Sequence, residues 1–122
     1  MIVKLPVGEA HATSEFGMAC QRLLPLAGTA QGVQEPPFGA MACYLAAGVA
    51  SEPDCHDQDE VMVVLSGRGD VEIADERAPV TAGELVVIPR NRTHVVRSSE
   101  DGTLAWISLY WPLHEPAAGG AT

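Results

Sequence analysis

Positively charged side chains are scarce in this chain of 122 residues. Seven Lys and Arg residues stand against sixteen Asp and Glu residues, which gives a formal net charge of -9 at pH 7. A surface with this excess of negative charge repels phosphate backbones and anionic lipid headgroups. We therefore expect neither nucleic acid nor a membrane among the partners of this protein.

Long hydrophobic runs and paired cysteines are also missing. No apolar stretch approaches the roughly 18 residues that a membrane-spanning helix needs. Residues 1–6 lack the apolar core of a secretion signal, so a cytoplasmic protein is expected. The three cysteines, Cys20, Cys43 and Cys55, are odd in number and have no paired spacing. This pattern argues against a disulfide framework and against a zinc knuckle.

Helix-length amphipathic patterns are absent as well, and short apolar runs separated by Gly, Pro, Asp and Asn take their place. Such runs are typical of an all-β sandwich or barrel. A chain of this length has room for one domain with its own core. The predicted strands are residues 18–25, 39–46, 61–66, 70–74, 84–89, 94–98 and 104–111.

Glycine and proline mark the turns between these strands. Residues 66–69 contain two glycines, which predicts a tight hairpin between the third and fourth strands. Gly83 precedes the apolar run 85–88, and Pro89 ends that run because proline cannot donate to a sheet ladder. The loop that contains residues 28–37 and the C-terminal residues 115–122 show no strand pattern.

Candidate metal ligands lie just before the third strand. Asp54, His56 and Glu60 share one parity along the chain, and this parity would place them on one face of a strand. In a straight strand, residues four apart are roughly 13 Å apart, whereas ligand atoms must lie about 2.0–2.2 Å from one ion. We therefore predict a bend within residues 57–59, a polar stretch with weak β propensity.

A second candidate ligand lies further along the chain. His94 follows a turn and opens another predicted strand. In a barrel, this position allows the imidazole to supply a nitrogen ligand from across the interior. Gly83 and Pro89 precede this histidine along the chain.

These two segments resemble the two conserved motifs of the cupin superfamily. The first cupin motif runs Gly, His-any-His, three or four residues, Glu, six residues, Gly, and the spacing from His56 to Glu60 and from Glu60 to Gly67 is similar to it. Asp54 stands where the first histidine of the motif would be.

The second cupin motif runs Gly, five residues, Pro-any-Gly, two residues, His. Gly83, Pro89 and His94 are in register with it. The glycine that follows the proline is replaced by Asn91, a residue that tolerates left-handed backbone.

The resemblance implies one all-β domain over residues 1–122, folded as a double-stranded β-helix, or jelly-roll, barrel. It places the barrel core at about residues 38–112, an N-terminal strand region at 1–28 and a loose tail at 115–122. It also implies a homodimer that pairs through edge strands.

The resemblance further implies one divalent metal ion held by His56, Glu60 and His94. Asp54 is either a fourth ligand, a group that binds through water, or a residue that orients a neighbour. Mixed nitrogen and oxygen ligands suit Zn, Fe, Mn or Ni, with a slight preference here for Zn or Fe. Two carboxylates and two neutral imidazoles would leave a divalent site near neutral, so we expect weaker attraction for an anionic substrate than at a site with three histidines.

Members of this superfamily include isomerases, lyases, cyclases and dioxygenases. The resemblance therefore implies a metal-dependent enzyme for a small polar metabolite, in specialised metabolism, with Asp54 or Glu60 as the catalytic base. The alternative is a non-catalytic metal-binding or small-molecule-binding module, or an accessory subunit.

Seven side chains of the predicted strands are expected to form the core. Their alternating phase lets some of them line a pocket beside the metal. They are Met41, Tyr44, Met62, Val64, Trp106, Ser108 and Tyr110. Cys55 has the opposite parity from its neighbours and is expected to be a buried structural thiol, and Gln58 is expected to belong to the bend.

Overall fold

The computed structural model describes residues 2–26 and 32–113. The predicted tail at 115–122 and the loop residues 28–31 lie outside this part of the chain. Within it, one short 3-10 helix precedes nine strands, and no helix is long and apolar enough to cross a membrane. The elements are η1 (Glu9–His11), β1 (Thr13–Glu15), β2 (Met18–Leu24), β3 (Gly39–Leu45), β4 (Asp59–Ser66), β5 (Arg68–Ile73), β6 (Glu76–Thr81), β7 (Leu85–Ile88), β8 (His94–Ser98) and β9 (Leu104–Trp111).

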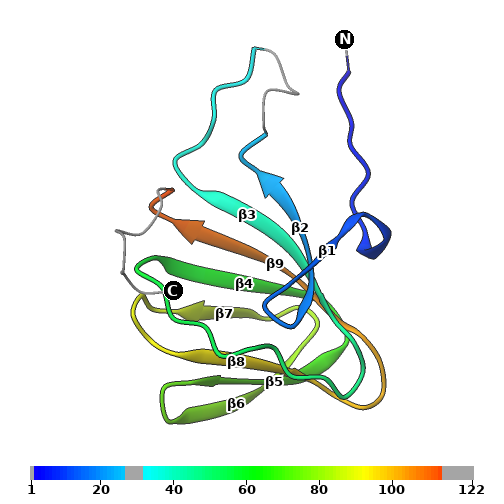
Figure 1. Cartoon of the computed structure of the whole chain (residues 1–122), viewed down its shortest axis with the longest axis vertical. Coiled ribbons are helices and arrows are strands. Elements are labelled where there is room, and N and C mark those ends of the chain that lie inside the picture. The colour runs from blue at the N-terminus through cyan, green and yellow to red at the C-terminus, as the bar shows by residue number, and fades with distance from the viewer. Residues whose placement is uncertain (1, 27–31, 114–122) are drawn as a thin grey trace.

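The strands form two antiparallel sheets, which confirms the predicted all-β class. The larger sheet has the order β1-β2-β3-β9-β4-β7, and the smaller sheet has the order β6-β5-β8. Figure 1 shows the smaller sheet at the bottom of the view, beyond the β7 edge of the larger one. Because β9 pairs with both β3 and β4, the last strand of the described chain lies between two strands that are distant from it in sequence.

Each of the seven predicted strands corresponds to an observed strand, with shifts at the ends. Two strands were not predicted: β1, which has only three residues, and β6, which contains Pro79. β6 lies at an edge of the smaller sheet, and an edge strand tolerates a residue that lacks a backbone N–H. Proline therefore costs little at this position.

The prediction of a tight hairpin at residues 66–69 is wrong. β4 ends at Ser66 in the larger sheet, and β5 begins at Arg68 in the smaller sheet, so Gly67 is the corner at which the chain changes sheets. Gly67 has a φ of 82°, and a Cβ atom at this position would clash with the backbone carbonyl of Thr103. Both features require glycine, for a reason other than hairpin geometry.

The hydrophobic core lies between the two sheets. The larger sheet contributes fully buried Leu45, Met62 and Leu104, and the smaller sheet contributes Val71 and Val96. Alternation along β8 then directs every second side chain of that strand into the same interior. The first residue of β8 is His94, which is only 8% exposed.

Candidate metal centre

A backbone bridge brings Asp54 beside His94. The N–H of Asp54 donates to the carbonyl of His94 at 3.1 Å, and the N–H of His94 donates to the carbonyl of Asp54 at 2.9 Å. Val96, two residues along β8, donates its N–H to the hydroxyl of Ser51 at 2.9 Å. The loop that carries Asp54 is thus attached to the start of β8, with both side chains on the inner face.

The predicted bend between His56 and Glu60 is confirmed. The chain bends at Asp57 and Gln58, and β4 begins at Asp59. His56 accepts the N–H of Asn91 on its carbonyl at 2.8 Å, which holds the bend against the turn after β7.

Two further contacts fix this region. Asn91 has a φ of 61°, the left-handed backbone expected at the position that replaces the motif glycine. The carboxylate of Asp59 accepts the N–H of Arg90 at 3.0 Å and pairs with its guanidinium at 3.1 Å. The Arg90 contacts also hold the pKa of the exposed Asp59 carboxyl below its usual value. The start of β4 and the turn after β7 are therefore joined beside the candidate ligands.

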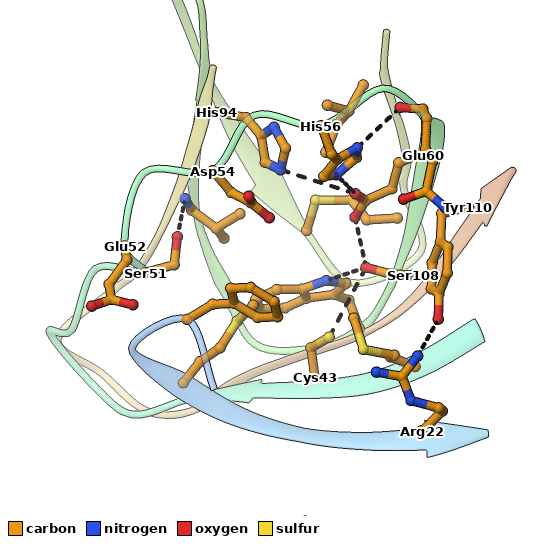
Figure 2. Close-up of a pocket in the computed structure, with 18 of the residues that line it drawn as sticks. Arg22, Cys43, Ser51, Glu52, Asp54, His56, Glu60, His94, Ser108 and Tyr110 are labelled. Carbon is orange, nitrogen blue, oxygen red and sulfur yellow. Dashed lines mark hydrogen bonds and ion pairs between the residues drawn. The ribbon is translucent and has the colours of Figure 1, made fainter. Parts of the chain in front are cut away.

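All four predicted ligands lie together in the folded chain (Figure 2). Asp54, His56 and His94 each offer a ligand atom within 4.8 Å of the others. Glu60 faces this group, with Oε1 3.0 Å from Nε2 of His56 and 3.9 Å from Nε2 of His94. Atoms about 2.1 Å from a shared ion are about 3.0 Å apart at a right angle and about 3.4 Å apart at a tetrahedral angle. The spacing fits one metal ion after small side-chain movements.

Backbone carbonyls orient both imidazoles. Nδ1 of His56 lies 3.1 Å from the carbonyl oxygen of Gln58, and Nδ1 of His94 lies 3.1 Å from that of Arg92. Because a carbonyl oxygen only accepts, Nδ1 must carry the hydrogen in each ring. In the neutral ring Nε2 then has a free lone pair directed at the other ligands, which is the orientation of a metal-binding histidine.

The contact between His56 and Glu60 needs a cation. A neutral His56 would direct the Nε2 lone pair at a carboxylate oxygen only 3.0 Å away, and two acceptors repel at that distance. The hydrogen bond to Glu60 raises the pKa of His56 and outweighs burial, which lowers it. A proton or a metal ion can occupy the space between these atoms, and both compete for the same lone pair.

A cavity of about 640 Å³ adjoins the four candidate ligands and is lined from both sheets. Five of the seven core candidates line it: Met41, Met62, Trp106, Ser108 and Tyr110. Val64 is buried in the core away from the cavity lining, and Tyr44, whose parity is opposite to that of Met41, is only partly buried and does not line it. Figure 2 shows Asp54 and His94 on one side of this space and Ser108 and Tyr110 on the other. The volume is in the range of small-molecule sites.

The chain matches the family described as a cupin domain over residues 41–110, a segment that includes Asp54, His56, Glu60 and His94. The chain belongs to the cupin family. The relationship expected from the two motifs is thereby confirmed. Among curated proteins, no match to this cupin is found.

Solved cupin structures resemble the chain over most of its length. A cupin 2 conserved barrel domain protein from Salinispora arenicola CNS-205 is 25% identical, with a TM-score of 0.79 over 93% of this chain and 91% of that one. The plu4264 protein from Photorhabdus luminescens is 26% identical, with a TM-score of 0.79 over 91% and 88%. Rru_A2000 from Rhodospirillum rubrum, a cupin-2 domain, is 19% identical, with a TM-score of 0.69 over 85% and 69%. These likenesses confirm the jelly-roll barrel.

A hydrogen-bonded pair of buried side chains supports Glu60 in this cupin. Ser108 donates its hydroxyl to Oε2 of Glu60 at 2.8 Å and accepts the indole N–H of Trp106 at 3.0 Å. Ser108 and Trp106 are each 2% exposed. Since Oε2 is held in this way, Oε1 is left to face the two histidines. The sequence placed both residues in the interior but did not indicate this role.

Replacing Ser108 by alanine is expected to weaken metal binding by about 10–100-fold, because the carboxylate loses the partner that orients it. The indole N–H of Trp106 also loses its acceptor, which costs about 1–3 kcal/mol of unfolding free energy. Metal titration and urea unfolding measure the two effects. Ser98→Ala is the control, since this buried hydroxyl donates to the carbonyl of Gly102 instead. Equal metal affinity in Ser108→Ala and Ser98→Ala would contradict the prediction.

Three other positions differ from expectation or were missed. Cys55 is only partly buried, so the prediction of a buried thiol is wrong. Gln58 lines the cavity as well as forming the bend, and it donates to the carbonyl of Pro112 at 2.8 Å. Arg22 of β2 also lines the cavity and was not singled out. An arginine within a predicted strand of mostly apolar residues was the signal available for it.

Proposed function

We propose that this cupin is a metal-dependent enzyme that binds a small molecule in the barrel cavity, with one divalent ion held by Asp54, His56, Glu60 and His94. One observation supports the proposal most strongly. Both imidazoles have Nδ1 committed to a carbonyl and Nε2 facing Glu60, with Asp54 in the same group, beside a cavity of about 640 Å³. Such a donor set suits Zn, Fe, Mn or Ni, with a slight preference for Zn or Fe.

The two carboxylates are assigned different roles. Both oxygens of Glu60 are engaged, one by His56 and one by the Ser108 hydroxyl, which suits a fixed ligand. Among the described residues, the carboxylate of Asp54 accepts one hydrogen bond, from the N–H of the next residue, Cys55, at 2.9 Å, and it points toward the cavity in Figure 2. When the metal does not fully engage its carboxylate, Asp54 is therefore the group better placed to take a proton from a bound substrate. A bound ion would supply Lewis-acid or O₂-activating chemistry.

The experiment has two steps. Protein purified without chelator is analysed for metal content, and one ion per chain is expected. The ion is then replaced by Co(II), and azide is added while the visible spectrum is followed. A spectral change is expected, because an enzyme needs a coordination position that a substrate can reach. Absence of metal would overturn the metal site. A Co(II) spectrum that does not change when azide is added would favour the non-catalytic binding module.

We also propose that two copies of this cupin associate through the outer face of β4 and β7. Leu65, Leu85 and Val87 are 57%, 57% and 62% exposed, and Val87 pairs with Val61 on the same outer face. β7 is the edge of the larger sheet, so a second copy would cover both the apolar side chains and the unpaired backbone.

Sedimentation equilibrium is expected to give twice the chain mass of 12.8 kDa. Val87→Glu should shift the protein toward monomer, because it puts a charge into the paired face. Thr81→Glu, at the exposed end of β6, is the matched control. A wild-type protein that stays monomeric at high concentration would contradict the proposal.

A further inference from the structure

Arg22 is the one Lys or Arg side chain among the described residues that line the cavity. It lies in β2 opposite Met41 of β3 and is exposed to solvent. Its Nη1 donates to the hydroxyl of Tyr110 at 2.9 Å, and no described carboxylate forms an ion pair with it. By contrast, four arginines form ion pairs with Asp or Glu: Arg68, Arg77, Arg90 and Arg97. Arg22 is thus a cation with most of its N–H donors available.

The contact between Arg22 and Tyr110 depends on a residue without a side chain in β3, the strand between them. Tyr110 belongs to β9, and Gly39 of β3 is its register partner. A Cβ atom at Gly39 would overlap the outer atoms of the Tyr110 ring. The ring therefore lies across β3 at a position without a side chain and reaches the arginine on β2.

The same tyrosine connects this contact with the metal centre. Glu60 of β4 is the register partner of Tyr110 on its other side, so the two side chains are neighbours on the inner face. Figure 2 shows Tyr110 between Glu60 and Arg22, with its hydroxyl directed at the guanidinium. The rest of the cavity lining is largely apolar and includes Met18, Met41 and Met62. The cavity thus combines a candidate metal centre and an arginine with an apolar lining.

We infer that Arg22 and Tyr110 bind a carboxylate group of the substrate, and that the substrate is a small carboxylic acid with an apolar body. The inference rests on the proposed function for the other end of the molecule, where an oxygen or nitrogen would meet the metal. The planar guanidinium fork matches a carboxylate, and the Tyr110 hydroxyl, which accepts from Arg22, keeps its own hydrogen for the ligand.

Charge favours a carboxylate over a phosphate ester. One guanidinium and one neutral hydroxyl offer a single positive charge, which balances one carboxylate but not a phosphate dianion. Burial raises the pKa of Tyr110, so the hydroxyl stays protonated at neutral pH. A near-neutral metal centre on a chain of net charge -9 attracts anions weakly, and Arg22 supplies a local positive charge for them.

The test uses acid and amide pairs that differ only in charge: 3-phenylpropionate with 3-phenylpropanamide, and hexanoate with hexanamide. Binding to the full-length protein is measured by calorimetry, with its metal and after the metal is removed. The acid of at least one pair is expected to bind about tenfold more tightly than its amide in both forms. Inorganic phosphate is the competing probe and should bind more weakly than the acid.

Arg22→Met should abolish the preference for the acid, and Gly39→Ala should reduce it by displacing the tyrosine ring while Arg22 stays in place. Arg77→Met is the control, because it removes the same charge from an exposed arginine outside the cavity. Equal binding of acid and amide by the wild type, no acid binding at all, or a preference that survives Arg22→Met would overturn the inference. If the protein holds no metal as purified and still prefers the acid to the amide, the anion site is supported and the proposed metal-dependent function is contradicted.

Discussion

His94→Ala is expected to lower metal affinity by more than about 100-fold, since loss of a ligand should cost more than loss of the groups that orient it. His94 contributes one of two imidazole nitrogens and approaches from the smaller sheet, whereas Glu60 belongs to the larger sheet. No other nitrogen ligand of the described cavity lining replaces it. A chelator-competition titration gives the affinity, and elemental analysis after dialysis gives the retained metal.

His11→Ala is the matched control for this variant. His11 is an exposed histidine in η1 and does not line the cavity. The His11→Ala variant should bind metal with the affinity of the wild type. If His94→Ala retained full affinity, the ligand set proposed for this cupin would be wrong.

The same centre should show a defined response to pH. Glu60 raises the pKa of His56 in the metal-free fold. Protonation of His56 therefore stabilises this fold fully at pH values below the pKa of His56 in the unfolded chain. This contribution is lost as the pH rises through the pKa of His56 in the folded protein. Metal displaces the same proton. The increase in Tm on adding metal should therefore grow from about pH 5.5 to about pH 8. An increase that is independent of pH would show that His56 does not exchange a proton for the ion.

Gly67→Ala is expected to reduce the free energy of unfolding by about 2–5 kcal/mol, the sum of left-handed backbone strain and a clash with backbone. The added methyl would meet the carbonyl of Thr103 and the Cα of Leu104. Leu104 is fully buried and begins β9, a central strand of the larger sheet, so neither group can move freely. Urea denaturation measures the loss.

Gly83→Ala separates the two causes. Gly83 has a φ of 92°, but a Cβ atom there would meet nothing within 4 Å. Its substitution should cost only the backbone strain, about 1–2 kcal/mol. If both variants lose the same free energy of unfolding, the close approach of Gly67 to β9 does not contribute to the loss.

Local signals in the sequence predicted much of this architecture. Short apolar runs bounded by Gly, Pro, Asp and Asn located seven of the nine observed strands, because turn residues mark where strands end. Distance arithmetic required a bend between His56 and Glu60, because an extended chain cannot bring residues four apart to one ion. The bend at Asp57 and Gln58 agrees with that requirement. The Pro79 strand was missed because edge position is not visible in a single segment.

The sequence by itself determined the all-β class, the cupin motifs and the set of candidate ligands, since each depends on spacing along the chain. Only the tertiary structure decided that Gly67 is a corner between sheets and that carbonyls orient both histidines. It also brought Arg22 against Tyr110, although 88 positions separate them. The reason is physical: strand pairing joins residues that are distant in the chain, and no local pattern records which strand will lie beside which.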